Sequence, residues 1–160
     1  MRRQHGLTLI ELLVTLTILA ILVSVAFPGF QGMMARNNLA TTSNSLLLAI
    51  NLARSEAVRN GATINLEAID PSTAANEWGP GWRVTVPGGP VLRVFEAVPG
   101  GLTLDSNEAS TTVQISSRGG LIGIPDYEFD LCSADQGGVR IRIAATGRAS
   151  TTDLAVGDCP

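Results

Sequence analysis

Hydrophobic residues dominate the start of the chain. The segment 7–27 is almost continuously apolar, and its few polar positions are Thr8, Glu11, Thr15, Thr17 and Ser24. A helix of this length measures roughly 30 Å, which is the thickness of the hydrocarbon core of a bilayer. We therefore expect a membrane-spanning helix over 7–27. Arg2 and Arg3 precede it, so the positive-inside rule predicts a cytoplasmic N-terminus.

The segment after this apolar run is more polar but keeps the period of a helix. One set of positions recurs at spacings of three and four: Leu39, Ser43, Leu46, Ile50, Ala53 and Ala57. This spacing predicts one buried face of an amphipathic helix. Pro28 marks the end of the purely apolar part and predicts a kink. Asn60-Gly61 predicts the end of the helix, so the amphipathic continuation covers 28–61.

The remaining segment, 62–160, has the alternation and the turn residues of a β-rich domain. Glycine and proline divide it at short intervals. The predicted strands lie at 63–69, 82–86, 91–97, 102–105, 111–117, 126–132, 139–145 and 151–155. The predicted fold class is therefore α+β, with a long N-terminal helix packed on a small β head.

Charge sets a limit on the possible partners of this domain. All eleven basic residues are arginine, against 14 acidic residues. The net charge is −3, and it becomes −5 without Arg2 and Arg3. A domain with this balance does not bind nucleic acid through its bulk charge. Any nucleic-acid contact needs a local basic patch.

The N-terminal segment has three interpretations. A secretory signal peptide could be cut near Ser24-Val-Ala26, although the apolar run exceeds the usual length of about 7–15 residues and contains a carboxylate. A plain single-span anchor is the second. In the third, the charged leader 1–6 ends at Gly6, and Glu11 follows five residues later within an unbroken apolar run. That combination resembles a type IV prepilin signal.

The prepilin resemblance implies specific processing. Prepilin peptidase would cut between Gly6 and Leu7, and the new N-terminus at Leu7 would be methylated. Glu11 and Pro28 would then occupy the positions at which pilins carry their glutamate and their helix-kinking proline. Pilins more often have phenylalanine after the glycine, so Leu7 is a departure from the family pattern.

Glu11 has two interpretations that are compatible with each other. An ionised side chain inside a membrane costs about 2.5–3.5 kcal/mol or more unless it is paired or lies near the interface. Thr8-x-x-Glu11 fits a capping box, and a carboxylate suits a helix N-terminus. Alternatively, Glu11 pairs with the positive α-amine of a neighbouring subunit and sets the axial register of stacked helices.

Three further segments resemble the GspH/FimT family of minor pilins and pseudopilins. They are Ala53-Arg-Ser-Glu-Ala57-Val-Arg-Asn-Gly61, the Trp78-x-x-Gly81-Trp82 unit, and Gly147-Arg148 before a terminal cysteine. The resemblance implies a helix packed on two small sheets.

This resemblance also implies a function. The chain would be a structural subunit of a type IV pilus or a type II secretion pseudopilus, held first in the bacterial inner membrane with its head in the periplasm. Its partners would be other pilins or pseudopilins, prepilin peptidase and the assembly platform. The sequence does not separate pilus from secretion system, and it does not identify the partner subunits or the position in the filament.

The cysteine content and the lack of catalytic motifs complete this picture. Cys132 and Cys159 predict one disulfide if the domain is exported, the alternative being two unrelated thiols. The one histidine, His5, lies in the leader, so we expect no histidine-based catalysis, metal or cofactor in the processed chain.

Two further hypotheses concern charged residues in the head. Asp126, Glu128 and Asp130 contain calcium-type oxygen ligands, but they alternate with apolar residues and better fit the solvent face of a strand. DNA binding in natural transformation is the alternative function. Some FimT proteins use a Gly-Arg-x-Arg loop, and this chain has Gly147-Arg148-Ala149-Ser150.

Arg140 and Arg142 could replace the missing second arginine of that loop. A hairpin between 126–132 and 139–145 instead places them on the solvent face with Glu128 and Asp130. Cross-strand ion pairs would then neutralise both arginines. Arg148 is therefore the best single candidate for a DNA contact.

Overall fold

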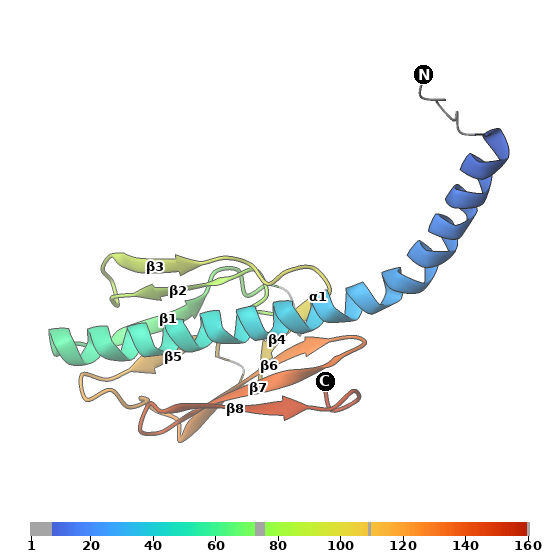
Figure 1. The fold of residues 1–160 in the computed structure, drawn as a ribbon. Coiled ribbons are helices and arrows are strands. Elements are labelled where there is room, and N and C mark those ends of the chain that lie inside the picture. The colour runs from blue at the N-terminus through green and yellow to red at the C-terminus, as the bar shows by residue number, and fades with distance from the viewer. Residues whose placement is uncertain (1–7, 73–75, 109, 160) are drawn as a thin grey trace. The chain divides into compact units, whose positions relative to one another are not determined.

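The computed structural model describes residues 8–72, 76–108 and 110–159, without the side chains of 25–29 and 31. In these residues one helix, α1 (Leu9–Asn60), precedes all of the strands (Figure 1). The chain divides into two compact units, Met1–Met34 and Ala35–Pro160, and each is described by itself. The second unit is called the head below.

The head contains two antiparallel four-stranded sheets. The strands are β1 (Ile64–Ala68), β2 (Trp82–Thr85), β3 (Val91–Phe95), β4 (Leu102–Ser106), β5 (Thr112–Ile115), β6 (Asp126–Ser133), β7 (Gly137–Ala144) and β8 (Ala149–Leu154). One sheet has the order β3-β2-β1-β5 and the other β4-β6-β7-β8. The predicted α+β class is confirmed, and each predicted strand is present to within two residues at either end.

The part of α1 in the first unit carries an apolar surface that the described residues leave uncovered. Its large hydrophobic side chains between residues 9 and 23 are all more than half exposed, and they lie on every side of the helix. They are Leu9, Ile10, Leu12, Leu13, Val14, Leu16, Ile18, Leu19, Ile21, Leu22 and Val23. Burial of such side chains is favourable, so this surface needs a partner or a lipid environment.

No helix within the described part of the chain is both long enough and apolar enough to cross a membrane. The membrane-spanning segment predicted over 7–27 includes positions outside the described residues, and it stays a prediction.

The part of α1 in the head is buried along one face, as its period predicts. Leu46, Ile50 and Ala53 have no exposed surface, and the remaining positions of the predicted face are also buried. These side chains join residues from both sheets in a single hydrophobic core. The helix runs alongside the sheets in Figure 1. Burial on this helix face therefore holds the two sheets together.

The end of α1 is closed by a glycine, as predicted. Gly61 has a φ of 62°, a conformation that favours glycine. The amide of Ala62 donates a hydrogen bond to the carbonyl of Ala57 at 3.2 Å. This is the longer of the two bonds of a Schellman motif, which satisfies a carbonyl that the helix would otherwise leave free.

Both tryptophans of the predicted turn lie inside the core rather than at the surface. Trp78 packs edge-on against Phe129, with ring centroids 4.9 Å apart. Trp82 stacks on Phe95 with an interplanar angle of 14°. The Gly-Pro-Gly unit between them turns the chain so that each indole contacts a different sheet.

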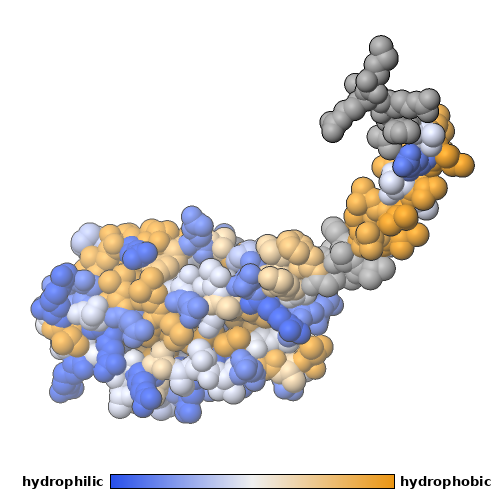
Figure 2. Space-filling view, in the orientation of Figure 1, coloured by the Kyte–Doolittle hydropathy of each residue, from blue (hydrophilic) through white to orange (hydrophobic). Residues whose placement is uncertain are grey.

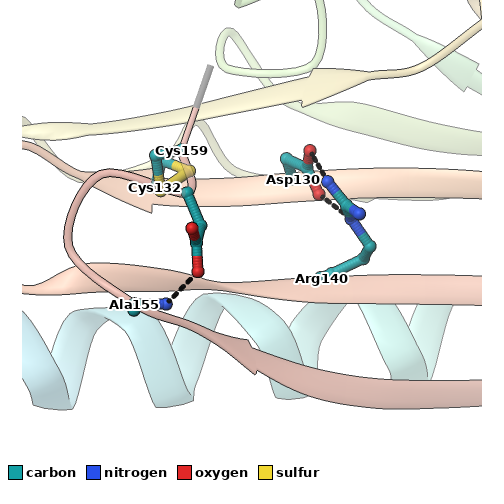
Figure 3. The surroundings of a disulfide bond; sticks show 6 residues. Asp130, Cys132, Arg140, Ala155 and Cys159 are labelled. Atoms are coloured by element: carbon teal, nitrogen blue, oxygen red, sulfur yellow. Dashed lines mark hydrogen bonds and ion pairs between the residues drawn. A yellow bond between two sulfur atoms is a disulfide. The ribbon is translucent and has the colours of Figure 1, made fainter.

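A disulfide joins Cys132 to Cys159, as predicted for an exported domain (Figure 3). Cys132 lies on β6 directly opposite Gly138 of β7. The C-terminal segment returns over this glycine to reach Cys132. A methyl group built on Gly138 would come within 2.4 Å of the Leu131 carbonyl and 2.9 Å of the Cys159 sulfur. Glycine is therefore required at position 138 for the C-terminal segment to pass over β7 and form the disulfide.

We expect Gly138→Ala to lower the stability of the oxidised head, because the added methyl group displaces either the β6 backbone or the disulfide. The loss should be about 2–4 kcal/mol, the usual contribution of a disulfide. Thermal unfolding with and without reductant measures it.

Gly100→Ala is the matched control, since a methyl group there meets nothing within 4 Å and its backbone is not left-handed. Equal melting temperatures for Gly138→Ala and wild type would contradict the required glycine.

Candidate functional site

Glu11 lies in the first turn of α1, where it is exposed. Thr8 immediately precedes the helix, and its hydroxyl accepts a hydrogen bond from the Glu11 amide at 3.3 Å. This is one half of the predicted capping box, and among the described residues the Glu11 carboxylate makes no ion pair. The threonine thus begins the helix and leaves the carboxylate available.

The other polar side chains of this apolar segment are satisfied within the helix itself. Thr15 donates to the Leu12 carbonyl at 2.9 Å, and Thr17 donates to the Leu13 carbonyl at 2.7 Å. Ser24 likewise donates to the Ile21 carbonyl at 2.8 Å. A hydroxyl that is already hydrogen-bonded to the helix backbone enters an apolar environment at a low free-energy cost, because its donor is satisfied. Glu11 is therefore the polar group that needs an external partner.

Two predicted features near the N-terminus lie partly or wholly outside the described residues. Gly6 and Leu7, the predicted cleavage and methylation positions, are both outside. The backbone at Pro28 is helical, and α1 continues to Asn60, but the side chain of this proline is not described. The predicted kink at Pro28 stays a prediction.

Arg140 is held by carboxylates of the neighbouring strand, as the hairpin pattern predicts. It lies opposite Asp130 in the register. Its guanidinium grips Asp130 with two hydrogen bonds of 2.7 Å (Figure 3). This contact raises the pKa of Arg140 above its ordinary value. The hydrogen bond to Asp130 is the larger cause, and the negative charge of Asp130 is the second.

Arg142 pairs with a predicted carboxylate, Glu128, and also with Asp126. Glu128 is its partner in the register and forms an ion pair with it at 3.5 Å. Asp126 lies two residues along the strand from Glu128, on the same face and within reach of a long side chain. The carboxylates on the solvent face of β6 are thus occupied by arginines, which accounts for their alternation better than a calcium site does. The described residues contain no cluster of acidic, histidine or cysteine side chains able to hold a metal.

Arg148 has a different environment from Arg140 and Arg142. It is exposed and makes no ion pair among the described residues. The turn before it is packed against the turn after β5, with the Leu121 amide donating to the Ala145 carbonyl at 2.9 Å. A methyl group built on Gly147 would lie 1.8 Å from the Gly119 carbonyl oxygen, so the two turns are in direct backbone contact.

This contact gathers three arginines that sequence reasoning did not group. Arg118 precedes Gly119, Arg148 follows Gly147, and the side chain of Arg54 on α1 lies against both glycines. Arg118 is exposed like Arg148, and none of the three makes an ion pair within the described residues. We call Arg54, Arg118 and Arg148 the arginine cluster. The one signal available in the sequence was a glycine beside an arginine in each turn.

A pair of carboxyl groups, Asp105 and Glu77, lies at β4, in the same sheet as Arg140. Asp105 of β4 is half-buried and lies opposite Asp130 in the register. Burial, a hydrogen bond with Glu77 and the charges of Glu77 and Asp130 raise the pKa of Asp105 to about 6. The two carboxyl groups therefore share a proton under mildly acidic conditions.

The raised pKa of Asp105 predicts that this pair stabilises the head as the pH falls. The folded protein holds the proton more tightly than the unfolded chain, so the stabilisation is complete below about pH 4 and is lost as the pH rises through about 6. We expect the melting temperature of the head to gain a few degrees from this pair between pH 7.5 and pH 5.

Asp105→Asn should remove this pH dependence, as melting curves across the same range would show. Asp153→Asn, which changes an exposed carboxylate on β8, is the control and should keep it. A wild-type melting temperature that does not depend more strongly on pH than that of Asp105→Asn would contradict the shared proton.

The α+β architecture and the apolar first half of α1 together define a type IV pilin-like protein. The chain belongs to the GspH family. The family model described as type II transport protein GspH matches residues 42–147. The model of the prokaryotic N-terminal methylation motif matches residues 1–27. The resemblance to GspH/FimT proteins found in the sequence is thereby confirmed.

Solved structures show the same fold. The type IV minor pilin FimU of Pseudomonas aeruginosa matches with a TM-score of 0.64 and 24% identity, over 75% of this chain and 92% of that one. A second crystal form of FimU gives a TM-score of 0.60 and 23% identity, over 71% and 92%. The minor pseudopilin EpsH of Vibrio cholerae gives 0.48 and 15%, over 75% and 98%. No curated protein matches. The fold is that of the minor pilin FimU.

Proposed function

We propose that this chain is a minor pilin or pseudopilin, a non-enzymatic structural subunit of a type IV pilus or a type II secretion pseudopilus. The observation that carries the proposal is the contrast within α1. The helix buries one face in the head, while its first half leaves apolar side chains uncovered on all sides around one carboxylate that no described residue pairs with. A surface of this kind suits a helix that packs among the helices of other subunits.

Processing and location follow from the same proposal. Prepilin peptidase cuts after Gly6, and the new N-terminus at Leu7 is methylated. The match of the N-terminal methylation motif over 1–27 supports this step. Before assembly the helix lies in the inner membrane with the head in the periplasm, and an inner-membrane platform then extracts it into the filament.

Glu11 provides the specificity of assembly in this proposal. Cleavage after Gly6 creates a positive α-amine at Leu7, and the carboxylate of a neighbouring subunit compensates that charge. In a low dielectric the attraction between opposite charges is strong, whereas an unpaired charge there is costly. Apolar contacts between helices permit many axial positions, but a single charge pair selects one.

We expect Glu11→Ala to reduce the amount of this chain in the filament fraction about tenfold or more. A tenfold loss corresponds to about 1.4 kcal/mol of assembly free energy. Immunoblots of sheared filaments, or of purified pseudopili, against whole-cell levels provide the measurement. Glu11→Gln should fail similarly, because it keeps the size and removes the charge.

Thr17→Val is the matched control. Its hydroxyl is already satisfied by the Leu13 carbonyl, so no partner is lost and incorporation should be normal. Wild-type incorporation of Glu11→Ala would contradict the role of the carboxylate.

DNA binding in natural transformation is the second candidate function, and the arginine cluster favours it. Phosphate contacts provide most of the affinity of non-specific DNA binding, and no described carboxylate forms an ion pair with these three arginines. Arg140 and Arg142, which the sequence offered as further contacts, are paired with acids instead. The net acidic charge of the chain limits such binding to this local patch.

Mobility-shift titration of residues 35–160 tests the DNA candidate. This unit contains every buried hydrophobic residue of the described chain, so it has its own core. We expect Arg148→Ala to weaken binding several-fold and to reduce the salt dependence by about one phosphate contact. Arg142→Ala, which removes an arginine already paired with acids, should bind like wild type. No shift of the wild-type head at low salt would remove this candidate.

A further inference from the structure

β3 lies at an edge of its sheet, and its outer side differs from the other sheet edges. β5 is covered, because the Ile122 amide donates to the Gln114 carbonyl at 3.0 Å. β4 is covered by the chain at residues 76–78, with the Trp78 amide donating to the Leu104 carbonyl at 3.2 Å. β8 is open but polar, with Ser150, Thr151, Thr152 and Asp153 exposed. Among the described strands, β3 alone presents an open edge that is largely apolar.

The apolar side chains of β3 are widely exposed for a sheet edge that no other segment covers. Val91 is 49% exposed, Leu92 38% and Val94 60%. The space-filling view gathers apolar side chains over the part of the head where Figure 1 places this strand (Figure 2). Proteins usually protect an edge with charges, proline or a covering segment, because its free amides and carbonyls accept another strand. An edge of this composition is therefore suited to pairing.

A groove of about 370 Å³ lies beside this edge, between β3 and the turn of α1 at residues 41–45. Trp82 and Phe95 line it from the sheet, while Thr42 and Ser45 line it from the helix. Its volume holds a few side chains, whereas a helix with its side chains is about 10–12 Å across. The groove therefore fits the side chains of one extended strand.

Arg93 determines the charge that an occupant must carry. It is exposed in the middle of β3, and its guanidinium lies 5.1 Å from the centre of the Phe95 ring. It makes no ion pair within the described residues. A carboxylate on the occupant would complete this site, since the aromatic ring below already holds the guanidinium in place.

The same arginine disfavours a second copy of this chain as the occupant. Antiparallel pairing of two β3 strands about their centre would place Arg93 directly opposite Arg93. Like charges directly opposite on neighbouring strands are destabilising. A different subunit, with an acidic residue at that position, avoids this repulsion.

We propose that β3 is the docking edge for an extended segment of a different pilin-like subunit, which adds a strand to this sheet. That segment carries apolar residues at alternate positions and a carboxylate opposite Arg93. The identity of the partner as a filament subunit rests on the proposed function, while the open edge and its charge come from the head alone. Main-chain hydrogen bonds supply affinity in such pairing, and the groove and Arg93 supply specificity.

Two substitutions in the full-length chain, expressed in its own host, test the edge. Val94→Lys places a charge on the docking edge, and Thr152→Lys does the same on the open edge of β8. Both side chains are exposed, so both purified heads should melt like wild type. We expect Val94→Lys to lower the amount of this chain in sheared filaments or purified pseudopili about tenfold. Thr152→Lys should leave that amount unchanged.

Arg93 variants test the charge. Arg93→Glu should incorporate less well than Arg93→Ala, because it repels the carboxylate of the partner rather than merely losing it. A photo-crosslinking residue at position 94 should form an adduct with a different pilin subunit, and the crosslinked site should lie in an extended segment of that subunit. The same residue at position 152 should not.

The outcomes separate this inference from the proposed function. If the wild-type chain is in the filament and Val94→Lys matches it, the docking edge is wrong and the subunit role stands. An adduct with a second copy of this chain, or equal incorporation of Arg93→Glu and Arg93→Ala, also overturns the docking proposal. Absence of the wild-type chain from filaments and pseudopili overturns both.

Discussion

The burial of one half of α1 and the exposure of the other half is the constraint on which this molecule depends. Within the head, the stripe from Leu39 to Ala57 lies in the core that both sheets share, so the helix and the sheets stabilise each other. Between Leu9 and Val23 no described residue supplies an equivalent surface. The hydrophobic effect that completes the head therefore leaves the start of the same helix incomplete, and assembly with other subunits would complete it.

Charge pairing separates the structural parts of the head from the parts able to contact partners. Arg140 and Arg142 are held by carboxylates on β6, and Arg83 is held by Glu67. Burial raises the pKa of Glu67, but hydrogen bonds from Asn65, Thr85 and Arg83 outweigh it and leave this pKa below its ordinary value. Arg93 and the arginine cluster have no such carboxylates among the described residues. An ion pair between strands neutralises an arginine, so that its charge is no longer available to an acidic partner. The arginines without an ion pair among the described residues therefore mark the surfaces able to bind one.

Local patterns in the sequence specify the elements of this fold well. The period of the helix, the glycine at its end and the alternation in the strands each follow from near neighbours, and so does the hairpin that pairs Arg140 with Asp130. The arginine cluster is not predictable in this way, because it depends on two turns that meet across the sheets at Gly119 and Gly147. The open edge of β3 depends similarly on strand order, and the contact of each tryptophan with a different sheet depends on tertiary packing.

The central claim is that the carboxylate of Glu11 is compensated by an α-amine that exists only after cleavage behind Gly6. Mass spectrometry of the N-terminal peptide, from the chain recovered in filaments or pseudopili, tests it most directly. The account predicts a mature chain that begins with methylated Leu7. A chain that begins at Met1, or at Phe27 after removal of the whole apolar segment, would contradict it.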